Sequence, residues 1–434
     1  MSPPEGLSNI LRTLKIGNYC LYTFGKFFSM VTIWMYRMAL AWIVWDMTHS
    51  ATWLGIFGFL DHAPSLLVSP LAGALSDRVD RMKFLRITQA MLVVHALLLS
   101  GLLAVDLAPI EVLAVLTLLF GVITNAQMPP SQSIIPNLVT KDLLTSAYGL
   151  NSMIFNMSRF IGPMAAGIVI GLWTPGLAIF FNAIGTIIFM LCLAFIRVEI
   201  KEGTRSHDTN LLTDMREGLR YASRHPGIGP ILTILTMAAV LTFPILQLLP
   251  SFADGIYGAG PQGLAWMIST LAVGAMLQGG YLATRASIAG LTSYVFLSMV
   301  LIALGFFMLA ATDILWFGLL SVFVIGFTMS SIKMGAFTLV QYAVDGNMRG
   351  RVASFIGVIY HAGPAVGSVL LGALGDLIGI RPTIAIAGGL MLAVWAWSVS
   401  RRQAIGAALE AMLPDDGAAT AGPSDKKRSG SPAG

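Results

Sequence analysis

The sequence predicts an all-α integral membrane protein with twelve transmembrane helices in two six-helix bundles. Of its 434 residues, 56% are hydrophobic and 11% are charged, and the mean hydropathy is +0.79. Soluble domains carry about 25% charged residues, so this composition excludes a water-exposed fold. The apolar residues also gather into twelve separate runs, and about 20 such residues are enough for a helix to cross the hydrocarbon layer.

The twelve runs follow one another with short connections, except for one long gap in the middle of the chain. They cover residues 17–45, 51–75, 84–105, 110–134, 145–171, 176–196, 228–250, 262–283, 290–311, 315–340, 352–376 and 382–400. Turn residues such as Gly258-Ala259-Gly260-Pro261 mark the short connections. The gap predicts an N-terminal bundle at 1–196, a central loop at 197–227 and a C-terminal bundle at 228–400.

The basic residues predict how the chain is oriented in the membrane. Twenty-one of the 26 lysines and arginines fall on one side of the predicted spans, and Arg381 alone falls on the other. Loops rich in Lys and Arg remain in the cytoplasm, so both termini are predicted to be cytoplasmic. The segment 401–434 is rich in Ala, Gly, Pro and Ser and is predicted to be a disordered cytoplasmic tail.

The central loop contains an amphipathic helix. Its apolar residues Leu211, Leu212, Met215 and Leu219 recur at helical spacing among charged residues, which is typical of a helix lying on a membrane face. Two interpretations remain open. The helix is either part of a spacer that lets the two bundles move or a site for a regulatory partner.

An internal repeat supports the division into two bundles. Gly149…Gly162-Pro163…Ala166-Gly167 recurs as Gly350…Gly363-Pro364…Gly367-Ser368, each residue 201 positions later. The two copies fall in the fifth and eleventh runs, which are equivalent positions if each bundle has six helices. Parallel repeats about an axis along the membrane normal are typical of one class of transporter, so a pseudo-two-fold relation between the bundles is predicted.

The loop between the second and third runs carries a recognisable motif. Gly73-x-Leu75-x-Asp77-Arg78-x-x-Arg81-x-Lys83 resembles the signature loop of the major facilitator superfamily. Asp80 replaces the Gly of the general pattern, as in the bacterial exporters called transmembrane secretion effectors, a branch that includes the enterobactin exporter. Trp34–Arg37 and Met348–Val352 are also similar to that branch. The resemblance implies the major facilitator fold and a multi-pass protein of the bacterial inner membrane.

The fifth run resembles the superfamily's antiporter motif. Gly149, Gly162, Pro163 and Gly167 match the motif, and Gly363 and Pro364 repeat part of it. The resemblance implies a hinge of the kind associated with proton-coupled export. The alternative is ordinary close packing, because small residues allow helix backbones to approach one another in many membrane proteins.

Ionisable residues within membrane spans are rare and are candidates for function. They are Lys26, Arg37, Asp61, His62, Arg159, Lys333 and His361. Arg37 lies eight residues before the outer end of the first run, and Asp61 lies about ten residues after the outer start of the second. They should reach similar depths, so an Arg37–Asp61 ion pair is predicted. The alternative to a functional pair is that Asp61 only neutralises a structural arginine.

Three cations have no evident intramembrane carboxylate. Arg159 is the strongest candidate for binding an anionic substrate group, because it lies near the midplane and cannot readily lose its charge. Lys26 and Lys333 can do the same, or can extend their ammonium groups to the lipid headgroups. The seven aromatic residues of the first run are expected to be mostly lipid-facing or interface anchors, with a minority lining an apolar pocket suited to aromatic or amphipathic substrates. The seven residues are Tyr19, Tyr22, Phe24, Phe27, Phe28, Trp34 and Tyr36.

Several polar residues are candidates for proton transfer or gating. Asp61 and His62 can titrate near neutral pH in a buried site. His361 beside Gly363 is also a candidate, although a histidine in that position is more often a helix-contact residue. Gln247 lies between Pro244 and Pro250, which predicts a broken helix that lines the cavity as an outer gate.

The signature loop also predicts a cytoplasmic gate. Asp77, with Arg78 and Arg81 nearby, would lie opposite the start of the eleventh run at Arg351. The free N–H groups and the dipole of that helix end attract a carboxylate. Asp77 is therefore predicted to latch the two bundles together when the inner side is closed.

The sequence carries no signature of an enzyme. It lacks a phosphate-binding loop, a metal-ligand cluster and a nucleophile elbow, so neither a cofactor nor a metal is expected, and the scattered basic residues argue against a nucleic-acid partner. The prediction is a monomeric secondary transporter among membrane lipids, exporting a small amphipathic, siderophore-like or drug-like molecule with an anionic group against protons. The alternatives are uptake or facilitated transport of an organic anion or lysolipid, and a non-transporting scaffold or sensor.

Overall fold

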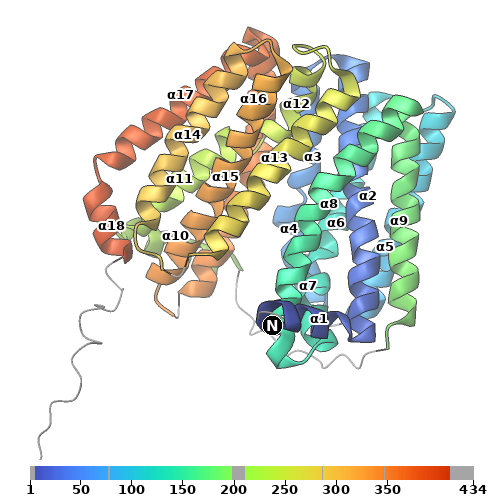
Figure 1. Ribbon diagram of the computed structural model, residues 1–434, viewed down its shortest axis with the longest axis horizontal. Coiled ribbons are helices and arrows are strands. Elements are labelled where there is room, and N and C mark those ends of the chain that lie inside the picture. The colour runs from blue at the N-terminus through green and yellow to red at the C-terminus, as the bar shows by residue number, and fades with distance from the viewer. Residues whose placement is uncertain (1–4, 77–78, 198–210, 286, 347, 411–434) are drawn as a thin grey trace, which may run out of the picture.

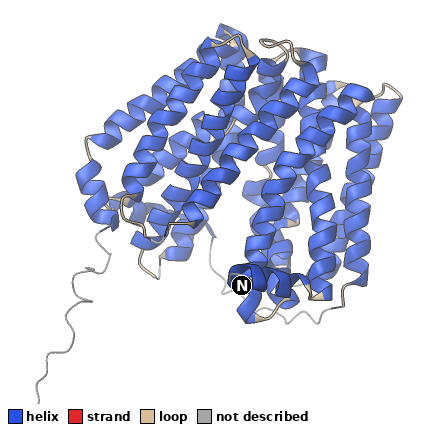
Figure 2. Ribbon diagram, viewed as in Figure 1, coloured by secondary structure: helices blue, strands red, loops and turns tan. Residues whose placement is uncertain are grey.

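The computed structural model describes residues 5–76, 79–197, 211–285, 287–346 and 348–410. The regular structure of these residues is helical (Figure 2). Twelve stretches are long and apolar enough to cross a membrane, as the sequence predicts. Three of the predicted spans, the second, the fourth and the seventh, are each divided into two helices.

The first six spans form the N-half, at the right of Figure 1. It consists of α2 (Gly17–Thr48), α3 (Ala51–His62), α4 (Ser65–Ser76), α5 (Arg81–Ala104), α6 (Ile110–Ala126), α7 (Met128–Leu138), α8 (Leu144–Leu172) and α9 (Pro175–Phe195), with a short 3-10 helix at Lys141–Leu143. The last six spans form the C-half at the left. It consists of α11 (Ile228–Leu241), α12 (Ile245–Ala253), α13 (Gly260–Ala283), α14 (Leu291–Ala311), α15 (Leu315–Ala343), α16 (Arg349–Ile378) and α17 (Ile380–Val399).

Three further helices lie at one end of the two halves, which we call the lower end (Figure 1). They are α1 (Glu5–Leu14), α10 (Leu211–Arg224) and α18 (Arg402–Glu410). The opposite, upper end contains the connection between α2 and α3. The lower end corresponds to the side that the charge distribution predicts to be cytoplasmic.

Local sequence explains where several helices begin. The Ser50 hydroxyl accepts a hydrogen bond from the N–H of Trp53 at 3.2 Å and caps α3. Asp80 accepts from the N–H groups of Met82 at 2.8 Å and Lys83 at 3.3 Å and caps α5. A side-chain acceptor at this position satisfies donors that have no partner within the helix. The aspartate that departs from the general signature loop therefore serves as a helix cap.

Prolines account for the divided spans. A proline lacks the N–H donor and clashes with the preceding turn, and the second span breaks between α3 and α4 at Ala63-Pro64. The fourth breaks at Gln127, just before Pro129-Pro130, and the seventh at Thr242–Pro244. Only the break in the seventh span was predicted. By contrast, α8 and α16 run without interruption through the predicted hinge prolines Pro163 and Pro364.

The prediction of a disordered tail is wrong for its first residues. Arg402–Glu410 form α18, in which Ile405 and Leu409, four residues apart, are fully buried. Arg402 also donates a hydrogen bond to Ser293 at 2.8 Å. The two apolar residues form one face of a short helix, and burying that face against the C-half favours order over the composition-based expectation. Residues 411–434 lie outside the described part of the chain.

The helix of the central loop is attached to the C-half. Glu217 forms an ion pair with Arg351 at 2.6 Å, and the Tyr221 hydroxyl donates to Asp345 at 3.0 Å. Burial raises the pKa of Tyr221, so the phenol remains a proton donor at physiological pH. These contacts fix α10 to the start of α16, a position that suits either a spacer or a regulatory site.

Candidate functional site

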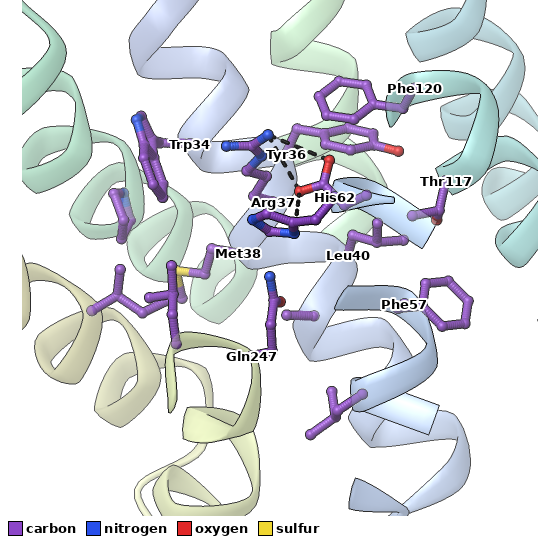
Figure 3. A pocket seen from close by; sticks show the side chains of 16 residues that line it. Trp34, Tyr36, Arg37, Met38, Leu40, Phe57, His62, Thr117, Phe120 and Gln247 are labelled. Atoms are coloured by element: carbon purple, nitrogen blue, oxygen red, sulfur yellow. Dashed lines mark hydrogen bonds and ion pairs between the residues drawn. The ribbon is translucent and has the colours of Figure 1, made fainter. Parts of the chain in front are cut away.

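A pocket lies between the two halves at the level of the break in the second span (Figure 3). Most of its lining comes from α2, α3 and α6, including Trp34, Arg37 and Asp61. Across the pocket, α12 contributes Gln247 and α13 contributes Ile268. Both halves therefore line the pocket.

The predicted ion pair between Arg37 and Asp61 is present in this pocket. Arg37 Nη2 lies 3.3 Å from each carboxylate oxygen of Asp61, and the side chain of Asp61 is 11% exposed. His62 Nδ1 lies 3.8 Å from the same carboxylate and 2.9 Å from the carbonyl oxygen of Gly58. A carbonyl oxygen only accepts hydrogen bonds, so this contact is a hydrogen bond when Nδ1 carries the proton.

The fourth span supports the backbone around Asp61. Asn125 Nδ2 donates to the carbonyl of Gly121 at 2.7 Å and to that of Asp61 at 3.4 Å. A Cβ on Gly121 would lie 2.8 Å from the carbonyl oxygen of Leu60, so only glycine allows this approach. Pro64 frees carbonyls at the end of α3, and α6 covers them. Sequence reasoning missed this support, although Gly121 and Asn125 lie one turn apart on the facing span.

Arg159, like Arg37 of the ion pair, lies against the ring of Trp34. The guanidinium carbon of Arg159 and that of Arg37 each lie 5.5 Å from the centre of the Trp34 ring. Within the described ranges, Arg159 has no ion-pair partner, and its buried Nε has no hydrogen-bond partner. A cation over an aromatic face is stabilised by the ring quadrupole, but it remains available to an anion.

The expectation that the aromatic residues of the first span face lipid is wrong for most of them. Four of the seven are buried in the protein, namely Tyr19, Tyr22, Trp34 and Tyr36, whereas Phe24 and Phe28 are exposed. The span packs against α3, α8 and α9 and is therefore enclosed on most sides. Trp34 is consequently part of the site, and hydropathy alone could not distinguish it from an interface anchor.

The remaining cations occupy different environments. Lys26 is buried, and its Nζ donates to the hydroxyls of Tyr22 at 3.1 Å and Ser131 at 3.2 Å. Its ammonium group therefore stays within the N-half and does not extend to headgroups. Lys333 is exposed, and its Nζ lies 4.6 Å from the centre of the Tyr360 ring. His361, the next residue, is half-buried on α16.

The predicted hinge glycines differ in how tightly they are packed. A Cβ on Gly162 would lie 2.5 Å from Trp34 Cβ and 2.6 Å from the carbonyl oxygen of Val31. Gly167 lies against Ala265, and Gly363 against Ala239. Gly149, in contrast, has nothing within 4 Å of the Cβ position. Close packing therefore explains why glycine occupies three of these four positions. It does not explain the glycine at Gly149.

We expect Gly162→Ala to destabilise the protein by about 1–3 kcal/mol, because an added methyl group overpacks the contact with α2. Gly149→Ala is the matched control, since it adds the same group to the same helix in open space and should be neutral or slightly stabilising. Thermal unfolding of the detergent-purified variants measures the difference. Equal midpoints for the two variants would contradict the packing assignment.

The predicted cytoplasmic gate is only partly covered by the structure. Asp77 and Arg78 lie outside the described residues, and Arg81 begins α5. At the start of α16, Arg351 pairs with Glu217 of the central helix. The latch between Asp77 and this helix end therefore stays a prediction.

Comparisons with known proteins agree with this architecture. Residues 14–414 match the family model of transmembrane secretion effectors. The chain is 25% identical to the staphyloferrin A transporter of Staphylococcus aureus, over 82% of this chain and 89% of that protein. It is 23% identical to macrolide efflux protein A of Streptococcus pyogenes, over 85% and 92%.

The fold is that of solved membrane transporters. The nucleoside transporter NupG superposes with a TM-score of 0.71, covering 88% of this chain and 98% of NupG at 11% identity. These relatives are transporters of small molecules rather than enzymes. The match to the family model spans the whole twelve-helix core, and the chain belongs to the transmembrane secretion effector family of the major facilitator superfamily.

Proposed function

We propose that this protein is a secondary active transporter that exports a small amphipathic molecule with an anionic group. The observation that carries the proposal is Arg159, a cation beside the pocket without a carboxylate partner among the described residues. In a site of low dielectric an unbalanced cation attracts an anion strongly. Trp34, Phe57 and Phe120 supply the apolar surface that an amphipathic molecule would contact.

Proton entry is proposed to drive export through Asp61 and His62. The Asp61 carboxylate lies 3.3 Å from Arg37 and 3.8 Å from His62, so both side chains are close enough to respond to its charge. A proton on Asp61 would release Arg37 from its ion pair and change the charge of the pocket. Relatives described as a staphyloferrin A transporter and a macrolide efflux protein favour a siderophore-like or drug-like substrate.

The transport cycle is proposed to be alternating access by a monomer in a lipid bilayer. The lower end would face the cytoplasm, because the basic loops gather there. In the present state the halves touch through hydrogen bonds near the upper end. Trp45 donates to Asp254, and Gln262 donates to the carbonyl of Gly167, each at 3.0 Å. The upper end would then be the closed, outer side.

The proposal is tested by finding the substrate and then measuring its exchange for protons. Metabolites inside and outside cells with and without the protein are compared, and the compound that accumulates inside when the protein is absent is added to proteoliposomes containing a pH-sensitive dye. We expect substrate-dependent proton movement that an imposed pH gradient accelerates. Substrate movement indifferent to the gradient indicates facilitated transport, and accumulation in the opposite direction indicates uptake. The absence of both flux and metabolite differences would support a scaffold or sensor.

A further inference from the structure

We propose that Asp376 acts as a latch that holds the upper end closed by capping α3 across the interface between the halves. Asp376 lies in the last turn of α16, in the C-half. Its carboxylate accepts hydrogen bonds from the N–H of Ala51 at 2.7 Å, the N–H of Thr52 at 3.0 Å and the hydroxyl of Ser50 at 2.5 Å. These three donors all belong to the beginning of α3, in the N-half.

Helix electrostatics explain why this contact is favourable. The first N–H groups of α3 have no partner within the helix and carry partial positive charge. Ser50 satisfies the N–H of Trp53, and Asp376 satisfies two others. At the C-terminal end of its own helix, a carboxylate is unfavourably placed. Asp376 therefore gains from contact with α3, and loses that gain when the halves separate.

Small residues bring the two helices close enough for the carboxylate to reach. Gly372 faces the carbonyl of Ala51, and a Cβ on Gly375 would lie 3.0 Å from Ala51 Cβ. One turn further along, Gly55 faces the carbonyl of Ser368. Glycines on both helices allow this close backbone approach, and α3 and α16 form one of the most extensive contacts between the halves.

At the corresponding contact between α8 and α13, the hydrogen bonds found in the described part of the chain involve only uncharged groups. There Gln262 donates its amide to the carbonyl of Gly167 at 3.0 Å. The latch is therefore one-sided. It can be set beside the cytoplasmic gate predicted from the sequence. That gate would use the same two spans at their opposite ends, with Asp77 at the end of the second span and the start of the eleventh.

The helix that Asp376 contacts, α3, is separated by a break from α4, the other part of the second span. α3 contains 12 residues and ends at His62, and α4 begins at Ser65 after the break at Ala63-Pro64. Asp376 binds one end of this short helix, and the Arg37–Asp61 pair lies at the other. Opening the upper end requires α3 to leave Asp376, with the break as the point where the span can bend.

The latch is tested by measuring access to the pocket from each side of the membrane. Leu40→Cys provides the reporter, since Leu40 lines the pocket and is 7% exposed (Figure 3). The native thiols are removed by Cys20→Ser and Cys192→Ala. A membrane-impermeant maleimide is applied to intact cells and to inverted vesicles, and the ratio of the two labelling rates is recorded. This readout requires no substrate, so it is independent of the proposed function.

We expect Asp376→Asn to shift the ratio about five- to tenfold toward access from the upper end, as the loss of hydrogen bonds to a charged group predicts. Asp376→Glu should retain most of the latch. Asp313→Asn is the matched control, because Asp313 pairs with Arg381 within the C-half. An unchanged ratio in Asp376→Asn, or an equal shift in Asp313→Asn, would overturn the proposal.

Disulfide formation provides a second measurement on the same contact. Ala51→Cys combined with Gly375→Cys places two thiols at the contact between α3 and α16. With Asp376 intact we expect rapid disulfide formation under mild oxidation, and with Asp376→Asn several-fold slower formation. Equal rates in the two backgrounds would count against the latch even if the labelling ratio changed.

Discussion

Replacing Arg159 with glutamine is expected to reduce transport by about 100-fold or more while leaving the protein folded in the membrane. The guanidinium lies 5.5 Å from the Trp34 ring centre and has no ion-pair partner among the described residues. Hydrogen bonds to charged groups contribute about 1.5–3 kcal/mol each, and an anion bound by the arginine fork would make two. Losing both hydrogen bonds therefore corresponds to a reduction in transport of about 100-fold or more.

The same geometry predicts that stability will not fall with activity. Removing one member of a buried ion pair leaves an uncompensated charge, but the described residues include no such partner of Arg159. Glutamine retains length and polarity, so thermal unfolding of the variant should match the wild type or improve on it. Arg159→Lys keeps the charge without the planar fork and should retain partial activity. Wild-type transport rates in Arg159→Gln would remove Arg159 from the binding site.

Arg86→Gln is a suitable control for a structural arginine. Arg86 Nη2 donates to the carbonyl of Leu193 at 2.6 Å, linking α5 to the end of α9. Its replacement leaves that carbonyl without this donor and is expected to lower stability by about 1–2 kcal/mol. Transport per folded molecule should stay near wild type. The two variants together separate loss of binding from loss of folding.

The positions of the spans could be predicted from sequence because the membrane imposes a simple length and composition on every crossing helix. The depth of a side chain in the membrane could be predicted by counting residues from the ends of its span. The Arg37–Asp61 pair follows from that count. The rotation of each helix about its own axis could not be predicted. Trp34 and Tyr36 look the same in hydropathy whether they face lipid or protein. Only their packing decides it, and here Trp34 contacts Phe155 of α8 while Tyr36 stacks on Phe120 of α6.

Features that depend on two distant segments were missed for a related reason. Pro64 and Pro129 are visible in the sequence, but prolines also occur in the unbroken helices α8 and α16. Whether a span breaks depends on what covers the freed carbonyls, such as Asn125 beside Asp61. The donors that Asp376 contacts could not be predicted from the sequence either, because 324 to 326 residues separate Asp376 from them.

Replacing Asp61 with asparagine is expected to abolish proton-coupled transport and also to lower stability. Arg37 then loses its carboxylate in a partly buried site, where its side chain is 34% exposed. Full burial of an unpaired charge costs about 3–5 kcal/mol, and partial exposure reduces the expected cost to about 1–2 kcal/mol. Thermal unfolding and proton flux in proteoliposomes measure the two losses separately.

Two double variants distinguish a structural pair from a functional one. Arg37→Met with Asp61→Leu removes both charges, so it should restore stability but not proton coupling, because no titratable group remains at the position of Asp61. The exchange Arg37→Asp with Asp61→Arg restores a pair and should recover stability together with part of the transport. If the uncharged double variant transports with normal proton coupling, Asp61 only neutralises Arg37. If the exchange recovers nothing that the single variants lost, direct pairing of Arg37 with Asp61 is not what the working protein requires of these two residues.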